Sequence, residues 1–298
     1  MPQDYRPAVK IGLDFFLLLV VGIPVLLYHL HGRPTIRGFN CDDDSIRYPY
    51  KDSTISNNVL YVVGVFLPII VISVTEFTNE ARSKRENRGR IYVLLGRPVP
   101  HVIWNIYKRI GIFLFGACMS QLTTDIAKYS IGRLRPHFLS VCEPNVSCSS
   151  LDPHAYVTNF VCLGKDANAI REGRLSFPSG HSSFSAYTMV FTVIYLQVFM
   201  QCRVNRLLKP FLQFVLLMMT WYTALSRIAD YKHHWSDVLI GFLLGVIVAI
   251  IVAVYVSDFF TKPKEKESDI ILQNISVDAP ATNYNTMDGG SGSQKLNS

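Results

Sequence analysis

Charged side chains are scarce in this chain. Asp, Glu, Lys and Arg together make up 17% of its 298 residues, whereas hydrophobic residues make up 49%. Its mean hydropathy is +0.24. Because charged residues make up about a quarter of a typical soluble domain, this shortage excludes most soluble classes and indicates a membrane protein.

Clusters of acidic residues are also lacking. The one acidic run is Asp42 to Asp44, which lies far in sequence from the basic motifs described below. We interpret it as a solvated turn, because a Mg²⁺ site needs several carboxylate ligands brought together. We therefore expect no metal ion and no other cofactor. We also expect no nucleic-acid partner, and no internal repeat is apparent.

Six apolar runs have roughly the length needed to cross a hydrocarbon core of about 20 residues. The fifth run is short and borrows Leu207 and Leu208, and the third is the least clear because charged residues flank its apolar centre. We predict an all-α, polytopic membrane protein whose six transmembrane helices form a bundle. The runs are Ile11 to Leu30, Val59 to Phe77, Val102 to Ala127, Ser182 to Met200, Phe211 to Leu225 and Val238 to Phe260.

The two ends of the chain differ from this domain, which we place at residues 11–260. Arg6 and Lys10 precede the first run as in a signal peptide, but the run is too long and no small-residue cleavage site follows, so we expect the chain to keep this helix. Residues 261–298 alternate Lys and Glu and then become rich in Ser, Gly and Asn. We predict a disordered tail there.

Basic residues indicate the orientation, because short loops rich in Lys and Arg tend to stay in the cytosol. They gather between the second and third runs, between the fourth and fifth, and after the sixth. Both termini are therefore predicted to be cytosolic, residues 1–10 included. The basic residues in question are Arg82, Lys84, Arg85, Arg88, Arg90, Arg97, Arg203, Arg206, Lys209, Lys262, Lys264 and Lys266.

The long loop between the third and fourth runs has features of an extracellular or luminal segment. Asn145 begins an Asn-Val-Ser glycosylation sequon. Four cysteines lie in the two outward loops, where an oxidising compartment permits disulfides, although their pairing cannot be read from the sequence. They are Cys41, Cys142, Cys148 and Cys162.

Three polar motifs lie at the ends of the predicted helices: KYSIGRLRP from Lys128 to Pro136, PSGH from Pro178 to His181, and SRIADYKHHWSD from Ser226 to Asp237. The first ends the third run, the second begins the fourth, and the last joins the fifth to the sixth. Both connections have the same parity, so all three motifs must face one side of the membrane. The topology therefore permits a composite site at that surface.

The cations of these motifs suit a phosphoryl group. Lys128 offers a point charge, and Arg135 and Arg227 offer planar guanidinium groups that can hold phosphate oxygens. The alternative is anchoring to lipid headgroups or a role in topology, which we prefer for Arg133 and Lys165.

Ser179, Gly180 and His181 stand where a loop becomes a helix. Free backbone N–H groups at a helix start attract anions, and glycine lets the backbone come close. Taken alone, this motif is better explained as an ordinary Pro-Ser helix start. The presence of the other two motifs in the same chain favours phosphate binding by Ser179 and Gly180.

His233 and Asp237 are four residues apart, so on a helix the carboxylate can accept an imidazole N–H and fix its tautomer. The other ring nitrogen is then available to attack phosphorus. His234, three residues from Asp237, can do the same in principle. Local spacing does not choose between the two histidines, and an isolated histidine at headgroup level needs no chemical role.

Together the motifs resemble the three-part signature of the type 2 phosphatidic acid phosphatase superfamily, whose core is similar to that of vanadium haloperoxidases. Three stretches resemble its animal lipid phosphate phosphatase branch: TDIAKYSIGRLRPHFL (Thr124 to Leu139), GRLSFPSGHSSFS (Gly173 to Ser185) and DYKHHWSDVL (Asp230 to Leu239). The resemblance implies a metal-independent phosphatase with His233 as nucleophile, oriented by Asp237, and His181 as proton donor. Lys128, Arg135, Arg227, Ser179 and Gly180 would hold the phosphate.

Members of that branch act on phosphatidic acid, lysophosphatidic acid, sphingosine 1-phosphate and ceramide 1-phosphate, usually outside the cytosol. The resemblance thus implies phospholipid and sphingolipid phosphates as partners, and the plasma membrane as the location, with a pool in the endoplasmic reticulum or Golgi. The oligomeric state, homo-oligomers included, stays open. Alternatives are a superfamily phosphatase for a polyprenyl diphosphate or sugar phosphate, a non-catalytic signalling relative, or a transporter. A transporter is disfavoured because no ionisable residue lies at the centre of a run.

Overall fold

The computed structural model describes residues 6–85, 91–94, 97–148, 152, 154–201 and 205–260. The predicted tail at residues 261–298 lies outside these residues, as do residues 1–5, Arg88, Arg90 and Arg203. Six of the described helices are long and apolar enough to span a membrane, which confirms the predicted fold class. They are α1 (Arg6–His31), α2 (Asn57–Arg85), α3 (His101–Ile131), α6 (Gly180–Phe199), α7 (Leu208–Ala229) and α8 (Trp235–Ile251).

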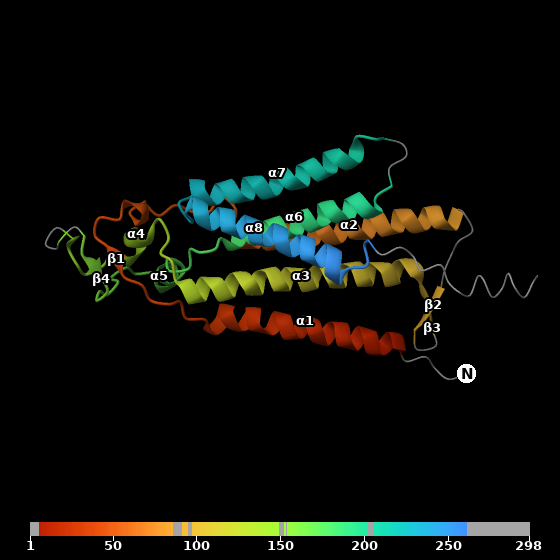
Figure 1. Cartoon of the computed structure of the whole chain (residues 1–298), viewed down its shortest axis with the longest axis horizontal. Helices are drawn as coiled ribbons and strands as arrows, with labels where there is room; N and C mark the ends of the chain where they lie inside the picture. Colours follow the sequence, from red (N-terminus) through yellow and green to blue (C-terminus); the bar gives the residue numbers. More distant parts are fainter. Residues whose placement is uncertain are drawn as a thin grey trace, which may run out of the picture. The chain divides into compact units, whose positions relative to one another are not determined.

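Helix α6 lies at the centre of the bundle, in contact with α2, α3, α7 and α8, while α1 packs on α3 (Figure 1). The side chains of α6 are mostly buried, whereas α1, α2 and α7 carry many exposed apolar side chains. In a bilayer those exposed side chains face lipid, so the position of α6 explains why its sequence is the richest in Ser and Thr.

Helices α6 and α8 approach each other through glycine. A Cβ placed on Gly241 of α8 would lie 2.5 Å from the backbone oxygen of Ser179, and one on Gly245 would strike the backbone oxygen of Ser183. Small residues spaced four apart let membrane helices pack closely. This contact sets the start of α6 directly against α8.

Some helix boundaries differ from the predicted runs. Helix α3 continues beyond Ala127 to Ile131, which puts Lys128 on its last turn. Helix α8 begins at Trp235 and gives way to a π-helical turn, Val252–Val256. Apolar length locates a span in the sequence but does not locate its ends, because polar residues extend helices into the interface.

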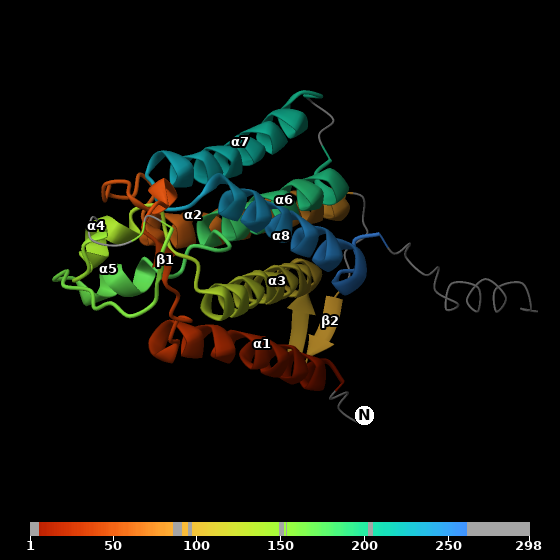
Figure 2. The ribbon, with the colours of Figure 1, turned by 60° about the vertical axis from the view of Figure 1, so that its left-hand side comes forward.

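Most of the short elements gather at one end of the bundle, where Figure 2 labels β1 (Phe39–Asn40), α4 (Phe138–Cys142) and α5 (Ala167–Glu172). Strand β1 pairs antiparallel with β4 (Tyr156–Val157). Disulfides join Cys41 to Cys148 and Cys142 to Cys162. Another element there is the 3₁₀ turn Asp44–Ile46, which contains part of the predicted acidic turn.

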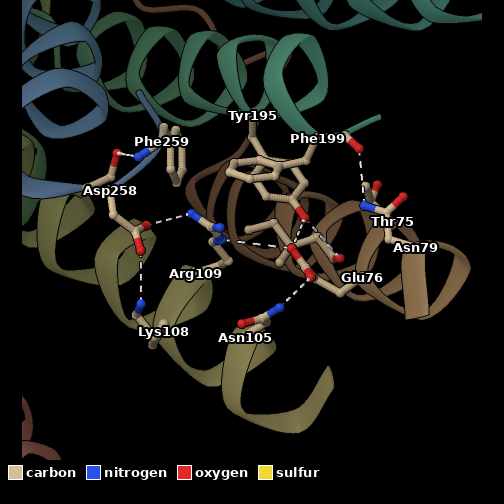
Figure 3. Close-up of polar contacts among 12 residues, drawn as sticks. Thr75, Glu76, Asn79, Asn105, Lys108, Arg109, Tyr195, Phe199, Asp258 and Phe259 are labelled. Atoms are coloured by element: carbon tan, nitrogen blue, oxygen red, sulfur yellow. Dashed lines mark hydrogen bonds and ion pairs between the residues drawn. The ribbon is translucent and has the colours of Figure 1, made fainter. Parts of the chain in front are cut away.

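The opposite end carries a hairpin of β2 (Ile91–Leu94) and β3 (Arg97–Pro100) and a polar cluster. In this cluster Arg109 lies 3.8 Å above the ring of Phe199 and donates to Asp258 at 2.8 Å (Figure 3). Tyr195 donates to Glu76 at 2.8 Å. The cluster ties α2, α3 and α6 to the segment that follows α8.

Candidate active site

The three sequence motifs meet at one cavity of about 830 Å³, located at the end of the bundle that carries the disulfides. This confirms the prediction, made from the parity of the helix connections, that all three motifs lie on one side of the bundle. Residues from every motif line the cavity, namely Lys128, Arg135, Gly180, His181, Arg227 and His233.

A left-handed turn at the end of α3 separates Lys128 from the two arginines of the first motif. Lys128 is on the last helical turn, and Gly132, with φ of 61°, ends the helix. Glycine adopts this conformation without steric cost, which makes it the common residue there. The chain then turns back, and the backbone N–H of Arg135 donates to the oxygen of Gly173 at 2.8 Å.

The two guanidinium groups have unused donors. Arg135 and Arg227 are buried, and the Nε of each has no hydrogen-bond partner among the described residues. Arg227 makes long contacts of 3.4 Å to the oxygen of Ile55 and to Ser53. Because buried donors are nearly always paired, this arrangement fits an anion that accepts from both groups.

At the start of α6, Ser179 caps the helix, whereas the next two residues line the cavity. Ser179 caps the helix by accepting from the Ser182 amide at 3.5 Å, and its own N–H donates to the backbone oxygen of Asp237 at 3.0 Å. Its side chain is fully buried. Gly180 and His181 line the cavity. Phosphate binding by Ser179 therefore stays a prediction, while its capping role is plain.

His181 contacts the loop before α2. Its Nε2 lies 3.1 Å from the carbonyl oxygen of Ile55, an acceptor, so Nε2 carries the proton in this contact. That leaves Nδ1 as the nitrogen that can exchange a proton with a bound group.

His233 is held with one ring nitrogen available. Its Nδ1 lies 2.7 Å from the carbonyl oxygen of Ser176, so Nδ1 is the donor and Nε2 keeps its lone pair. Burial, followed by the positive charges of Arg135 and Lys128, lowers the pKa of His233 well below its ordinary value. The imidazole is therefore neutral near pH 7, as a nucleophile must be.

The predicted contact between His233 and Asp237 is wrong. His233 precedes α8, whose N-cap is His234, so the helical spacing that would bring the pair together does not exist. Asp237 accepts instead from the hydroxyl of Ser176 at 2.6 Å and from Nδ1 of His234 at 3.1 Å. It therefore supports His233 through Ser176.

This arrangement also separates the two histidines that spacing left equivalent. His234 turns its Nδ1 to Asp237 and does not line the cavity, whereas His233 does.

Arg133 also departs from its prediction as a headgroup anchor. Its guanidinium donates to Asp237 at 2.5 Å and to Ser236 at 2.9 Å. The Asp237 side chain is fully buried, so this ion pair supplies the charge partner that a buried carboxylate requires.

Several residues of the cavity wall were missed. Lys232 lies 3.7 Å above the ring of Tyr50, and burial, followed by Arg135 and Arg227, lowers its pKa to about 8. Glu172, at the end of α5, accepts from Arg135 at 2.7 Å. Burial would raise the pKa of Glu172, but Arg135 and Lys128 outweigh it and lower that pKa. Lys232 stands beside His233 in its motif, whereas nothing local marks Glu172.

Within the described residues, no group of three His, Cys, Asp or Glu side chains is placed to hold a metal ion. The charged groups at the cavity are mostly cationic, and such groups do not make a ligand set for a divalent cation.

Comparison with known proteins agrees with this geometry. The PAP2 superfamily model matches residues 109–260. A putative phosphatidate phosphatase of Drosophila melanogaster is 48% identical over 89% of this chain and 73% of its own length. Phospholipid phosphatase 1 of Rattus norvegicus (47%) and phospholipid phosphatase 2 of Mus musculus (43%) each match 86% of this chain and 88% of their own length. No solved structure matches. The chain belongs to the phospholipid phosphatase family of the PAP2 superfamily.

Proposed function

We propose that this chain is a lipid phosphate phosphatase that hydrolyses phosphatidic acid, lysophosphatidic acid, sphingosine 1-phosphate and ceramide 1-phosphate. The observation that carries the proposal is the neutral, buried His233, whose Nε2 is available in a cavity lined by Lys128, Arg135 and Arg227. The names of the relatives support phosphatidate as one substrate. Such a site can bind a phosphate and attack it.

The reaction proceeds through a phosphohistidine. Nε2 of His233 attacks phosphorus and forms a P–N bond while the bond from phosphorus to the lipid oxygen breaks. The departing oxygen takes a proton from His181, whose charged form the bound phosphate favours. His181 then removes a proton from water, and the water oxygen displaces His233 from phosphorus. The products are the lipid alcohol and inorganic phosphate.

No metal ion is needed in this scheme. Lys128, Arg135 and Arg227 offset the charge that develops on the phosphoryl oxygens, and the start of α6 adds backbone N–H groups. Metal independence is therefore part of the proposal.

The site faces the outside of the cell or a lumen, with both termini cytosolic. In support, the cavity lies at the same end as two disulfides and the exposed Asn145, features expected where the environment is oxidising and glycosylation occurs. We expect the plasma membrane, with a pool in the endoplasmic reticulum or Golgi.

The decisive experiment measures phosphate release by the purified chain in mixed micelles containing excess chelator. Phosphatidate, lysophosphatidate, sphingosine 1-phosphate, ceramide 1-phosphate, a polyprenyl diphosphate and glucose 6-phosphate form the panel. Turnover of the lipid monophosphates without added Mg²⁺ supports the proposal. Dependence on Mg²⁺, or preference for the diphosphate or the sugar phosphate, would reject it in favour of the corresponding alternative.

His233→Ala should abolish turnover and leave no phosphoenzyme after acid-free quenching with radiolabelled substrate. His234→Ala is the matched control, because His234 is the adjacent imidazole but does not line the cavity. A trapped phosphoenzyme in His233→Ala would transfer the nucleophile's role to another residue.

A further inference from the structure

Two polar residues of α3 line the same cavity, and the proposed hydrolysis uses neither of them. They are Gln121 and Asp125, which stand one helical turn apart. Gln121 Nε2 donates to both carboxylate oxygens of Asp125, at 3.0 and 3.1 Å. The other amide atom, Gln121 Oε1, is buried and accepts from none of the described residues. Together the two side chains present acceptors to the cavity.

A buried carboxylate within a membrane span is costly, and such residues usually pair with a cation or serve a function. Asp125 is 9% exposed. The ion pairs within the described part of the chain do not include it, although Lys128, His29 and the hydroxyl of Tyr61 are near enough to interact electrostatically. Among the described residues, the hydrogen bonds to the Asp125 carboxylate come from the neutral amide of Gln121, which leaves further lone pairs of the two oxygens available for a ligand.

The position of Asp125 relative to Lys128 shows in which order charged and polar groups follow one another along the cavity. They are three positions apart, so Asp125 lies about 4.5 Å deeper along the axis of α3. The same cavity is also lined by α1, with Gly22, Val25 and Leu26. A Cβ on Gly22 would lie 3.8 Å from Sγ of Cys118, which is about two turns of α3 deeper than Asp125. From the phosphate cations inward, the cavity therefore presents cations, then acceptors, then apolar surface.

Lipid phosphates carry their groups in the same order. After the phosphate comes the carbon that bears it, then a neighbouring carbon with a polar substituent, and then the chains. That substituent is an ammonium in sphingosine 1-phosphate and a hydroxyl in 2-lysophosphatidate bearing its acyl group on the terminal carbon, and both donate hydrogen bonds. In phosphatidate it is an ester, which cannot donate.

We propose that Asp125 and Gln121 bind the hydrogen-bond donor that lies next to the phosphoester, and so favour donor-bearing lipid phosphates, sphingosine 1-phosphate above all. This inference rests on the proposed lipid phosphatase function. The ammonium gains most because it pairs with a carboxylate, whereas the hydroxyl makes one charge-assisted hydrogen bond.

The test compares kcat/KM for sphingosine 1-phosphate, lysophosphatidate and phosphatidate, using the purified full chain in mixed micelles. Asp125→Asn keeps the shape of the side chain and removes its charge. Because hydrogen bonds to charged groups are stronger than those between neutral groups, the ratio of sphingosine 1-phosphate to phosphatidate should fall by about tenfold to a hundredfold. The ratio of lysophosphatidate to phosphatidate should fall less.

Thr123→Val is the matched control, because Thr123 is on the same turns of α3 but its hydroxyl donates to the Met119 oxygen of its own helix. It should leave both ratios unchanged. Gln121→Met removes the second acceptor and decides the outcome if Asp125→Asn proves unstable: it should lower both ratios.

An equal loss for all three lipids, or unchanged ratios, would overturn the inference and reduce Asp125 and Gln121 to a structural pair. Vanadate inhibition measured in parallel shows whether the phosphate cations are intact. A wild-type chain that hydrolyses none of the three lipids would instead contradict the proposed function, so the two failures are distinct.

Discussion

Asp237 and Arg133 show how a buried charge can act on a reactive group through a neighbour. Asp237 accepts from the hydroxyl of Ser176, whose carbonyl accepts Nδ1–H of His233, and Arg133 balances the charge of Asp237. Because the carboxylate does not touch the imidazole, its influence on His233 is positional. Removing its partner should therefore disturb attack more than binding.

Arg133→Ala should lower kcat for phosphatidate by about tenfold with little change in KM, because an uncompensated carboxylate will shift Ser176. Arg133→Lys should recover part of the loss. Steady-state kinetics provide the measurement, and Arg174→Ala is the control, since Arg174 is a basic residue of the same face that stacks on Phe138 outside the cavity. A change confined to KM would show that Arg133 contacts substrate instead.

From the lowered pKa of Lys232 we predict that activity falls at high pH. With a pKa lowered to about 8, Lys232 is charged below that pH and neutral above it, so a positive charge at the cavity wall is lost as the pH rises through about 8. The KM for phosphatidate should rise there. A pH profile of kcat/KM tests this, and Lys232→Arg, which stays charged, should move the limit upward. An identical profile in that variant would assign the limit to another group.

At the residue scale, the sequence was sufficient for groups whose chemistry is carried by residue type and motif. The sequence predicted five of the cations and histidines that line the cavity: Lys128, Arg135, Arg227, His181 and His233. It did not predict the lining residues Lys232, His29 and His137, nor Ser176 and Glu172. Ser176 acts through its backbone oxygen, which every residue possesses, and Glu172 reaches Arg135 from a separate short helix. Tertiary packing creates both contacts, and local patterns do not report it.

At the scale of elements, the contact between α6 and α8 controls the site. Gly241 packs against the backbone of Ser179, whose N–H donates to the Asp237 oxygen, so the helix start that carries Gly180 and His181 is positioned by α8. The sequence predicted both helices. It did not predict their closest approach, because a glycine within an apolar run has several structural explanations.

Gly241→Ala should lower kcat/KM for phosphatidate by at least about tenfold, because its Cβ would lie 2.5 Å from the Ser179 oxygen and the start of α6 must move. The thermal midpoint in detergent should fall as well. Gly111→Ala is the matched control: Gly111 is also in a membrane helix, but nothing lies within 4 Å of an added Cβ. Full activity in Gly241→Ala would mean that α8 does not position the motif.

At the scale of the whole molecule, the side of the membrane was predicted from charge and the meeting of the motifs from parity. Parity depends only on counting helices, and the six described spans confirm it. Orientation is a separate matter, because a bundle of six helices can be inserted either way round. It requires a chemical mark that only one compartment adds.

Asn145 offers that mark. It is exposed, and its side-chain oxygen accepts from the Val161 amide at 2.9 Å, which leaves its Nδ2 at the surface of the loop. Asn145→Gln should abolish a glycosidase-sensitive mass shift in protein from animal cells, with activity retained. The predicted cytosolic tail contains a second sequon, Asn274-Ile275-Ser276, and Asn274→Gln should leave the shift in place. The reverse pattern would invert the orientation.

The bridge between Cys41 and Cys148 has a consequence for biogenesis. Its two sulfurs are 107 residues apart, with α2 and α3 between them. Neither partner can meet the other until the ribosome has finished α3 and the translocon has delivered both loops to one compartment. A newly made polypeptide therefore reaches its mature oxidation state only after insertion of its first half.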